Sequence, residues 1–107
     1  MPYFVKTYRS QTVIEGQNLI ITCNSWGNPI PEITWLFHDQ PLSIPHSDKF
    51  SPFRIVSTLE LRKVTKRDQG HYKCQAKNKN EDRESPAIIV RVKGMTDWEV
   101  GKMIIIG

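Results

Sequence analysis

The sequence has few of the residues and patterns that would identify an enzyme or a metal protein. Among 107 residues there are three histidines and two cysteines, and no glycine-rich phosphate-binding loop occurs. His38 and His71 fall at strand positions predicted to face outward, and His46 lies in a proline-containing loop. No group of histidine, cysteine and aspartate has the spacing of metal ligands. We therefore expect no enzyme activity, no metal site and no cofactor.

Long hydrophobic runs are missing as well. No stretch approaches the roughly 20 apolar residues of a membrane-spanning helix, and residues 1–6 lack the basic start and apolar core of a signal peptide. No Asn-x-Ser/Thr glycosylation acceptor occurs. Because the chain ends abruptly after the apolar run 103–106, we expect a fragment of a longer protein, whose own ends say little about targeting.

The charge excess is too modest to indicate nucleic-acid binding. The net charge is +4, from 15 basic and 11 acidic residues, and no Lys/Arg block is longer than the pairs at 62–63 and 66–67. The aromatic residues fall at positions expected in a core. Hydrophobic content of 38% and charged content of 24% are typical of a soluble globular domain.

Alternation of apolar and polar residues with a period of two dominates the chain and predicts strands rather than helices. Seven short strands separated by turns predict an all-β sandwich. The stretch 38–49 contains two prolines and is predicted to hold at most a short edge strand. Strands are predicted at 17–23, 33–38, 58–64, 71–77 and 86–93, with a first strand and its continuation in 3–14. The residues predicted to point inward are Leu19, Ile21, Cys23, Ile33, Trp35, Phe37, Leu59, Leu61, Tyr72, Cys74, Ala76, Ile88, Val90 and Val92.

The most informative motif comprises Cys23, Trp35 and Cys74. The cysteines lie roughly 50 residues apart with the tryptophan between them, and the run 68–74 (Asp-Gln-Gly-His-Tyr-Lys-Cys) leads into the second cysteine. This constellation resembles the immunoglobulin fold, and the run 27–35 (Gly-Asn-Pro-Ile-Pro-Glu-Ile-Thr-Trp) resembles its I-set in particular. The resemblance covers residues 10–93. It is specific for the fold and weak for function, because this sandwich carries many unrelated binding roles.

The resemblance implies an immunoglobulin-like I-set β-sandwich of two antiparallel sheets with Greek-key connections over residues 1–94. It also implies a disulfide between Cys23 and Cys74, a core that contains Trp35 and Leu61, and a tyrosine corner at Tyr72. A disulfide favours an oxidising compartment. In cytosolic domains of this kind the two cysteines instead stay reduced and pack as small apolar groups.

Residues 95–107 follow the complete sandwich and are expected to form a tail or linker. Four interpretations remain open for this segment: the approach to a membrane span, the first strand of a following domain, a docking segment, or a disordered end.

Asp68 carries the most position-specific charge. By resemblance, the aspartate of such a run caps the adjacent turn or pairs with a basic residue, for which Arg54 and Lys63 are the candidates. The run 61–70 also resembles a loop of membrane-proximal domains in receptor tyrosine kinases, where a basic residue and an aspartate five positions later pair with a second copy. Lys63 and Asp68 have that spacing, although those families usually have arginine, whose bidentate contact lysine cannot make.

One outer face is predicted to bind a partner. If the strands at 33–38, 71–77 and 86–93 lie side by side, two aliphatic side chains point outward among basic ones. An apolar centre with a charged rim is typical of interfaces, although isolated exposed apolar residues are ordinary on any surface. A tryptophan at the preceding turn adds an aromatic anchor unless it folds over the end of the sandwich. The predicted binding residues are Leu36, Ile89, Lys73, Lys77, Arg91 and Trp26.

By resemblance, we expect a protein–protein recognition module of a multi-domain cell-surface or extracellular-matrix protein, with an unknown ligand or a homotypic immunoglobulin contact as partner. The alternative is a structural and docking module of a cytoplasmic myofilament or cytoskeletal protein. A further hypothesis, which rests on composition alone, is binding of an acidic polysaccharide. It would involve Lys63, Lys66, Arg67, Lys73 and Lys77. We expect no nucleic-acid partner, and membrane contact only through other parts of the parent chain.

Overall fold

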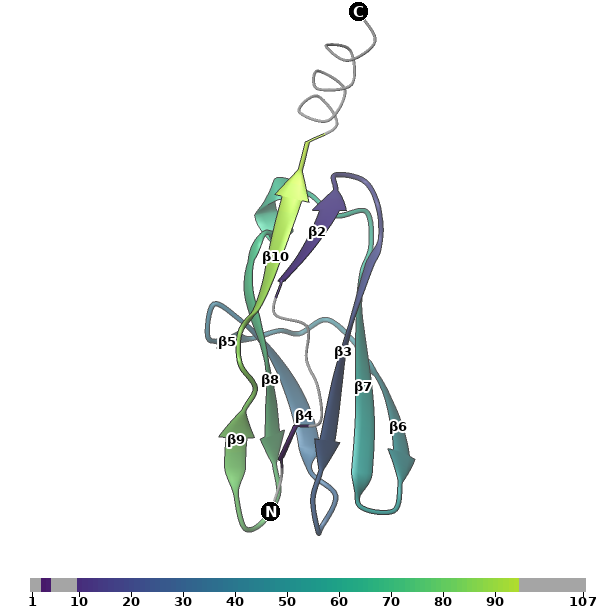
Figure 1. Cartoon of the computed structure of the whole chain (residues 1–107), viewed down its shortest axis with the longest axis vertical. Helices are drawn as coiled ribbons and strands as arrows, with labels where there is room; N and C mark the ends of the chain where they lie inside the picture. The colour runs from purple at the N-terminus through teal and green to yellow at the C-terminus, as the bar shows by residue number, and fades with distance from the viewer. Residues whose placement is uncertain (1–2, 5–9, 95–107) are drawn as a thin grey trace, which may run out of the picture.

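The computed structural model describes residues 3–4 and 10–94, which form a sandwich of two β-sheets (Figure 1). The first sheet has the strand order β1-β3-β7-β6, and the second has the order β2-β10-β8-β4-β5 with β9 beside β8. The elements are β1 (Tyr3–Phe4), β2 (Ser10–Ile14), β3 (Leu19–Trp26), β4 (Glu32–Phe37), β5 (Gln40–Pro41), β6 (Ser47–Ser51), β7 (Arg54–Leu61), the 3-10 helix η1 (Lys66–Asp68), β8 (Gly70–Lys77), β9 (Asp82–Glu84) and β10 (Ile88–Lys93).

The N-terminal segment contributes a strand to each sheet. β1 pairs antiparallel with β3, whereas β2 runs parallel to β10 in the other sheet. This parallel pair is the one departure, within the described residues, from the expected antiparallel pairing. In the view of Figure 1, β10 ends at the upper pole of the sandwich, while β1 and the hairpin between β6 and β7 lie at the lower one.

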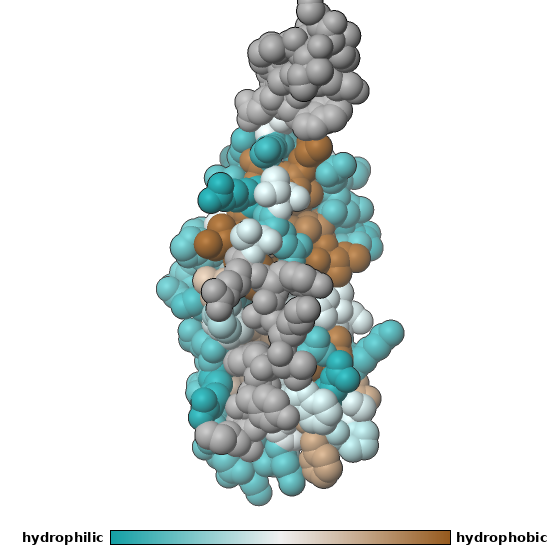
Figure 2. Space-filling model, in the orientation of Figure 1, coloured by the Kyte–Doolittle hydropathy of each residue, from teal (hydrophilic) through white to brown (hydrophobic). Residues whose placement is uncertain are grey.

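The core forms because each long strand buries alternate side chains between the sheets. In β7 the residues Ile55, Ser57, Leu59 and Leu61 are buried, and those between them are partly exposed. Figure 2 shows hydrophobic residues also reaching the surface in the upper half of one side, over β2, β10 and β3. The inward predictions confirmed as buried are Ile21, Cys23, Ile33, Trp35, Leu59, Leu61, Tyr72, Cys74, Ala76, Ile88, Val90 and Val92. Leu19 and Phe37 are partly buried against this core.

The edge strand β6 begins in the stretch 38–49, which was predicted to be mostly loop and to hold at most a short edge strand. Its sequence, Ser-Asp-Lys-Phe-Ser, is too polar to show a period-two pattern, and its pairing with β7 follows from the hairpin that places Ser51 opposite Arg54. β7 accordingly begins before the predicted start at residue 58. In the described part of the chain, no helix has the length and apolar character needed to cross a membrane.

Candidate functional site

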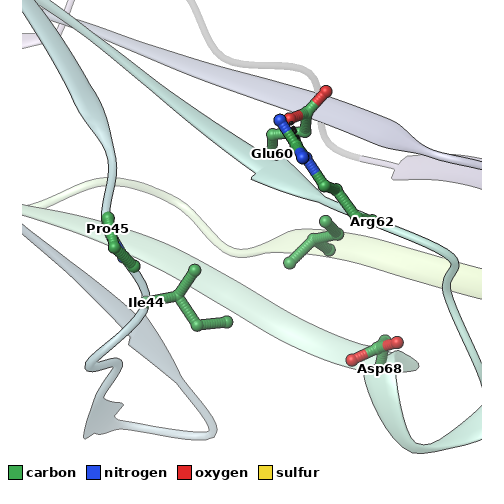
Figure 3. A pocket seen from close by; sticks show the side chains of 6 residues that line it. Ile44, Pro45, Glu60, Arg62 and Asp68 are labelled. Atoms are coloured by element: carbon green, nitrogen blue, oxygen red, sulfur yellow. Dashed lines mark hydrogen bonds and ion pairs between the residues drawn. The ribbon is translucent and has the colours of Figure 1, made fainter.

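An apolar flank lies beside the connection between β5 and β6. Ile20 on β3 is 56% exposed and Ile44 in the connection is 40% exposed. Two hollows of about 430 Å³ each adjoin them, and Pro45 and Glu60 line both. Figure 3 shows Ile44 and Pro45 on one side of the first hollow and Glu60 and Arg62 on the other. We call Ile20, Ile44, Pro45 and Glu60 the Pro45 flank.

Two charged groups, the flank's own Glu60 and the neighbouring Arg62, lie beside its apolar residues. The Nε of Arg62 donates to Oε1 of Glu60 at 2.6 Å, and this hydrogen bond raises the pKa of the Arg62 guanidinium. An apolar centre with a charged border is the usual composition of a protein interface. This surface was not predicted from the sequence because Ile44 and Pro45 lie in a loop without periodicity. The sequence does contain one signal for this surface, the run of three apolar residues 19–21. When Leu19 and Ile21 face inward on a strand, Ile20 between them must face outward.

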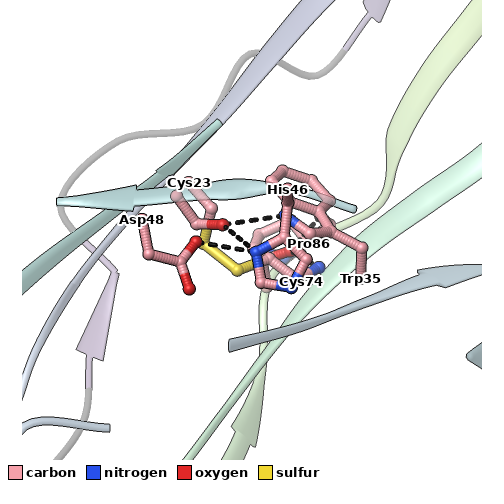
Figure 4. The surroundings of a disulfide bond; sticks show 8 residues. Cys23, Trp35, His46, Asp48, Cys74 and Pro86 are labelled. Carbon is pink, nitrogen blue, oxygen red and sulfur yellow. Dashed lines mark hydrogen bonds and ion pairs between the residues drawn. A yellow bond between two sulfur atoms is a disulfide. The ribbon is translucent and has the colours of Figure 1, made fainter. Parts of the chain in front are cut away.

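His46, next to Pro45, points from the same connection into the sandwich (Figure 4). Its Nδ1 lies 2.7 Å from Oδ1 of Asp48 and 3.2 Å from Oγ of Ser57. The Nε1 of Trp35 donates to the same Ser57 hydroxyl at 2.9 Å. Because a carboxylate only accepts hydrogen bonds, we assign the proton of the shorter His46 contact to Nδ1. These bonds fasten the connection to the core residue Trp35.

This arrangement of serine, histidine and aspartate is structural rather than catalytic. In a catalytic triad the serine and the carboxylate contact opposite nitrogens of the imidazole. Here both contact Nδ1 of His46, so that nitrogen cannot accept the Ser57 proton while it donates to Asp48. Ser57 is also fully buried, which keeps substrate away from its hydroxyl. Among the described residues, no group of three or more His, Cys, Asp or Glu side chains is arranged to hold a metal ion.

The disulfide between Cys23 and Cys74 joins β3 of one sheet to β8 of the other, with 6.4 Å between the two Cα atoms. Both cysteines are fully buried, and Trp35, which is 1% exposed, lies opposite Cys74 in the register of β4 and β8. Figure 4 shows the indole beside the sulfur atoms. The predicted bridge and the predicted core position of Trp35 are confirmed.

A tyrosine corner fixes the start of β8, as predicted. The hydroxyl of Tyr72 donates to the backbone carbonyl of Asp68 at 2.6 Å. Burial of the ring, with a smaller contribution from the negative charge of Asp68, raises the pKa of the Tyr72 phenol. The phenol is therefore held protonated, as a hydrogen-bond donor.

Asp68 caps η1, which confirms one of its two predicted roles. Its Oδ2 accepts the backbone N–H of Thr65 at 2.8 Å, and the Thr65 hydroxyl accepts the N–H of Arg67, which completes a capping box. The alternative role, an ion pair with Arg54 or Lys63 of the same chain, is not among the ion pairs found in the described residues, and the pairing of Lys63 and Asp68 with a second copy stays a prediction. The Lys63 backbone instead donates to Oδ1 of Asn18.

The residue predicted at the centre of the binding face is buried. Leu36 was expected to be exposed, but it is 5% exposed and lies outside the main core cluster. It stands opposite Lys73 on one neighbouring strand and Pro41 on the other, and paired residues project from the same face of a sheet. The side chains of these two neighbours flank Leu36 on both sides, which explains its burial.

The rest of that face is only partly as predicted. Lys73 lies 3.1 Å from the carboxylate of Asp39 and 3.6 Å from that of Glu84, and the bond to Asp39 raises its pKa. Its charge is therefore largely compensated. Ile89 is half-buried, and only Lys77 and Arg91 are exposed as predicted; the binding role of this face stays a prediction.

Trp26 belongs to β3 rather than to the turn after it. Its backbone pairs with Tyr3 on β1 and with Arg54 on β7, and the Arg54 guanidinium lies 5.6 Å from the centre of its ring. The ring is half-buried. This contact reduces its availability as a binding anchor.

Comparison with known proteins agrees with this geometry. The model of the immunoglobulin I-set domain matches residues 2–91. The smooth-muscle myosin light chain kinase of Gallus gallus is 37% identical over 92 residues, which cover 86% of this chain and 5% of that protein. The peroxidasin homolog of Homo sapiens is 37% identical over 78 residues, which cover 73% of this chain and 5% of that protein. The chain therefore spans only about a twentieth of the length of these relatives.

A solved structure shows the same fold. A chain in the complex of Dpr2 Ig1-Ig2 with DIP-Theta Ig1-Ig3 superposes with a TM-score of 0.80 at 23% identity. The match covers 85% of this chain and 32% of that chain. At this identity the likeness concerns the architecture alone.

Proposed function

Because the chain belongs to the immunoglobulin I-set family, we propose that it is a protein-recognition module of a multi-domain cell-surface or extracellular-matrix protein. The partner is another protein with an immunoglobulin-type domain, in line with the complex of such domains that contains the structural neighbour. The observation that carries the proposal is the Pro45 flank, where exposed Ile20 and Ile44 border two adjoining hollows.

The Pro45 flank suits recognition better than the face predicted from the sequence. Its two isoleucines are exposed, whereas Leu36 is covered, and its connection is held in place by the bonds of His46 to Asp48 and Ser57. A surface that is rigid before binding loses less conformational entropy when a partner docks. The face formed by Ile89, Lys77 and Arg91 is the second candidate contact surface.

The extracellular setting is supported by the disulfide, because such bonds persist mainly in oxidising compartments. The alternative setting is the cytoplasm, where this chain would be a structural module of a filament-associated protein. Its similarity to smooth-muscle myosin light chain kinase favours that alternative. The redox state of the cysteines in the cell separates the two settings.

Binding of the labelled chain to intact cells and to deposited matrix tests the proposal. We expect binding that disappears when the cells are treated with trypsin and falls about tenfold in Ile44→Glu, since a charge at the centre of an apolar contact is left without a partner. Lys49→Glu, an exposed change on β6, is the control and should bind normally. Equal binding of Ile44→Glu and the unchanged chain would contradict the proposed surface.

A further inference from the structure

Three segments that are distant in the sequence are tied together at the pole where β10 ends. The turn after β2 is bonded to the end of β10, with the Glu15 N–H donating to the Lys93 carbonyl at 2.7 Å. The connection between β7 and β8 is bonded to the same strand, since Lys66 Nζ donates to the Val92 carbonyl at 3.0 Å and the Val92 N–H donates to Gln69 at 2.9 Å. The backbones at this pole therefore have fixed relative positions.

Basic side chains concentrate on these segments. Lys66 and Arg67 lie in η1, Lys63 lies just before it, and Arg91 and Lys93 lie on β10, which η1 contacts. All five residues are exposed. We call Lys63, Lys66, Arg67, Arg91 and Lys93 the basic pole.

Among the described residues, the acidic groups near the basic pole are Asp68, Glu60 and Glu15, fewer than its five basic side chains. The carboxylate of Asp68 accepts a hydrogen bond from the Thr65 N–H within the capping box, and the carboxylate of Glu60 accepts one from the Arg62 side chain. Elsewhere on the described surface some basic side chains pair with acidic ones, as where Lys73 meets Asp39 and Glu84 and where Arg83 meets Glu81. Among the described residues, the positive excess is therefore concentrated at this pole.

We propose that the basic pole binds a sulfated polysaccharide. Arg91 and Lys93 project from the same face of β10 about 7 Å apart, the two-residue repeat of a strand, and η1 adds two more cations beside them. A row of fixed cations matches a linear polymer that carries repeated sulfate groups, and Arg offers such oxygens a planar pair of donors. Composition alone had suggested Lys73 and Lys77 as well, but Lys73 is paired with carboxylates and Lys77 lies at the far end of β8.

The observations favour a polysaccharide over other polyanions. Single-stranded nucleic acids need aromatic side chains for base stacking, whereas the exposed rings of Phe50 and Phe53 lie at the hairpin of β6 and β7, at the opposite pole. Stable docking on a lipid surface needs apolar groups that insert, and the exposed isoleucines Ile20 and Ile44 belong to the Pro45 flank rather than to the basic pole. The inference rests on the proposed extracellular setting, where sulfated polysaccharides occur.

Heparin serves as the probe, and its dissociation constant is measured by calorimetry over a range of salt concentrations with the 107-residue chain. The test variant is Arg67→Glu combined with Lys93→Glu, and the control is Lys49→Glu combined with Lys79→Glu, which changes the net charge equally at the other end. We expect the test variant to bind about tenfold or more weakly, with a salt dependence reduced by about one unit of slope per lost ion pair. The control should bind like the unchanged chain.

Three outcomes would overturn the proposal: no heparin binding by the unchanged chain, equal weakening in both variants, or stronger binding to phosphatidylserine vesicles or single-stranded DNA than to heparin. Unchanged melting temperatures ensure that a loss of binding is not a loss of folding. Heparinase treatment of cells separates this proposal from the proposed function. Cell binding that survives heparinase but not trypsin belongs to protein recognition, and binding that heparinase removes belongs to the basic pole.

Discussion

At the residue scale, Tyr72 shows how one buried side chain connects sequence, fold and pH response. Its ring is 2% exposed, and its hydroxyl holds the turn that also contains the cap of η1. Because burial raises the pKa of this phenol in the folded protein, ionisation is easier in the unfolded chain. The free energy of unfolding therefore depends on the protonation of the Tyr72 phenol only in alkaline solution.

We predict that stability falls with alkaline pH through Tyr72. Below about pH 10 the phenol is protonated in both states and adds no pH dependence. Above that pH the unfolded chain loses its proton first, and this group lowers the free energy of unfolding by about 1.4 kcal/mol per pH unit. Tyr72→Phe should remove that slope, and at neutral pH it should cost about 1 kcal/mol for the lost hydrogen bond. Urea titrations from pH 7 to pH 11 measure both effects, and an identical alkaline slope in the two proteins would refute the assignment.

Single residues also mark the limit of the sequence prediction. Strand periodicity placed Cys23, Trp35 and Tyr72 correctly, because an alternating pattern states which face a side chain takes. It failed for Leu36, because facing away from the core does not mean exposure when neighbouring strands supply covering side chains. The Pro45 flank was missed for a related reason, since a loop has no periodicity to interpret.

At the scale of elements, the hairpin between β4 and β5 depends on a glycine in another strand. The hairpin turns through His38 and Asp39, which both have positive φ angles, and the His38 N–H donates to the His71 carbonyl at 3.0 Å. The His38 ring then packs against the backbone of Gly70 at the start of β8, where φ is +151°. A Cβ at this position would lie 2.7 Å from Cε1 of His38 and 2.8 Å from Cε1 of Phe37.

We predict that Gly70→Ala destabilises the domain by about 1–3 kcal/mol, because the added methyl group meets His38 and Phe37 and the backbone angle disfavours any side chain. Adding His38→Ala should recover part of the loss, since it removes one of the two obstructing rings. Gly16→Ala is the matched control, because Gly16 also has a positive φ but has no atom within 4 Å of the added Cβ. Denaturant titration that gives equal losses at Gly70 and Gly16 would show that the packing against His38 contributes nothing.

The strand edges were the elements least accessible to sequence reasoning. β6 is a polar five-residue strand that forms because the hairpin brings it beside β7, and no local pattern indicates that pairing. The parallel pairing of β2 with β10 likewise joins strands that lie far apart in the sequence. Contacts between distant parts of the chain decide both, whereas the central strands could be predicted from their own residues.

At the scale of the whole molecule, the disulfide and the surfaces of the sandwich have separate roles. Cys23 and Cys74 join the two sheets in the interior, next to Trp35, whereas the Pro45 flank and the basic pole lie on the outside. The cysteine motif was sufficient to predict the fold, because cross-linked sheets need that spacing. It says nothing about the two surfaces, whose residues come from separate segments and meet only in the folded chain.

The last prediction concerns the bridge between the sheets. Closing a loop of roughly 50 residues restricts the unfolded chain, so reduction should lower the free energy of unfolding by about 4 kcal/mol in the entropic account. Urea titration with and without reductant measures this difference, and the control variant Ser25→Ala, a buried change on β3 that leaves both cysteines in place, should respond to reductant like the unchanged chain. Intact mass after alkylation without reductant reports the native state of the cysteines. Two freely alkylated thiols in protein isolated from its natural source would contradict the extracellular proposal and favour the cytoplasmic setting, where both cysteines would pack as small apolar groups.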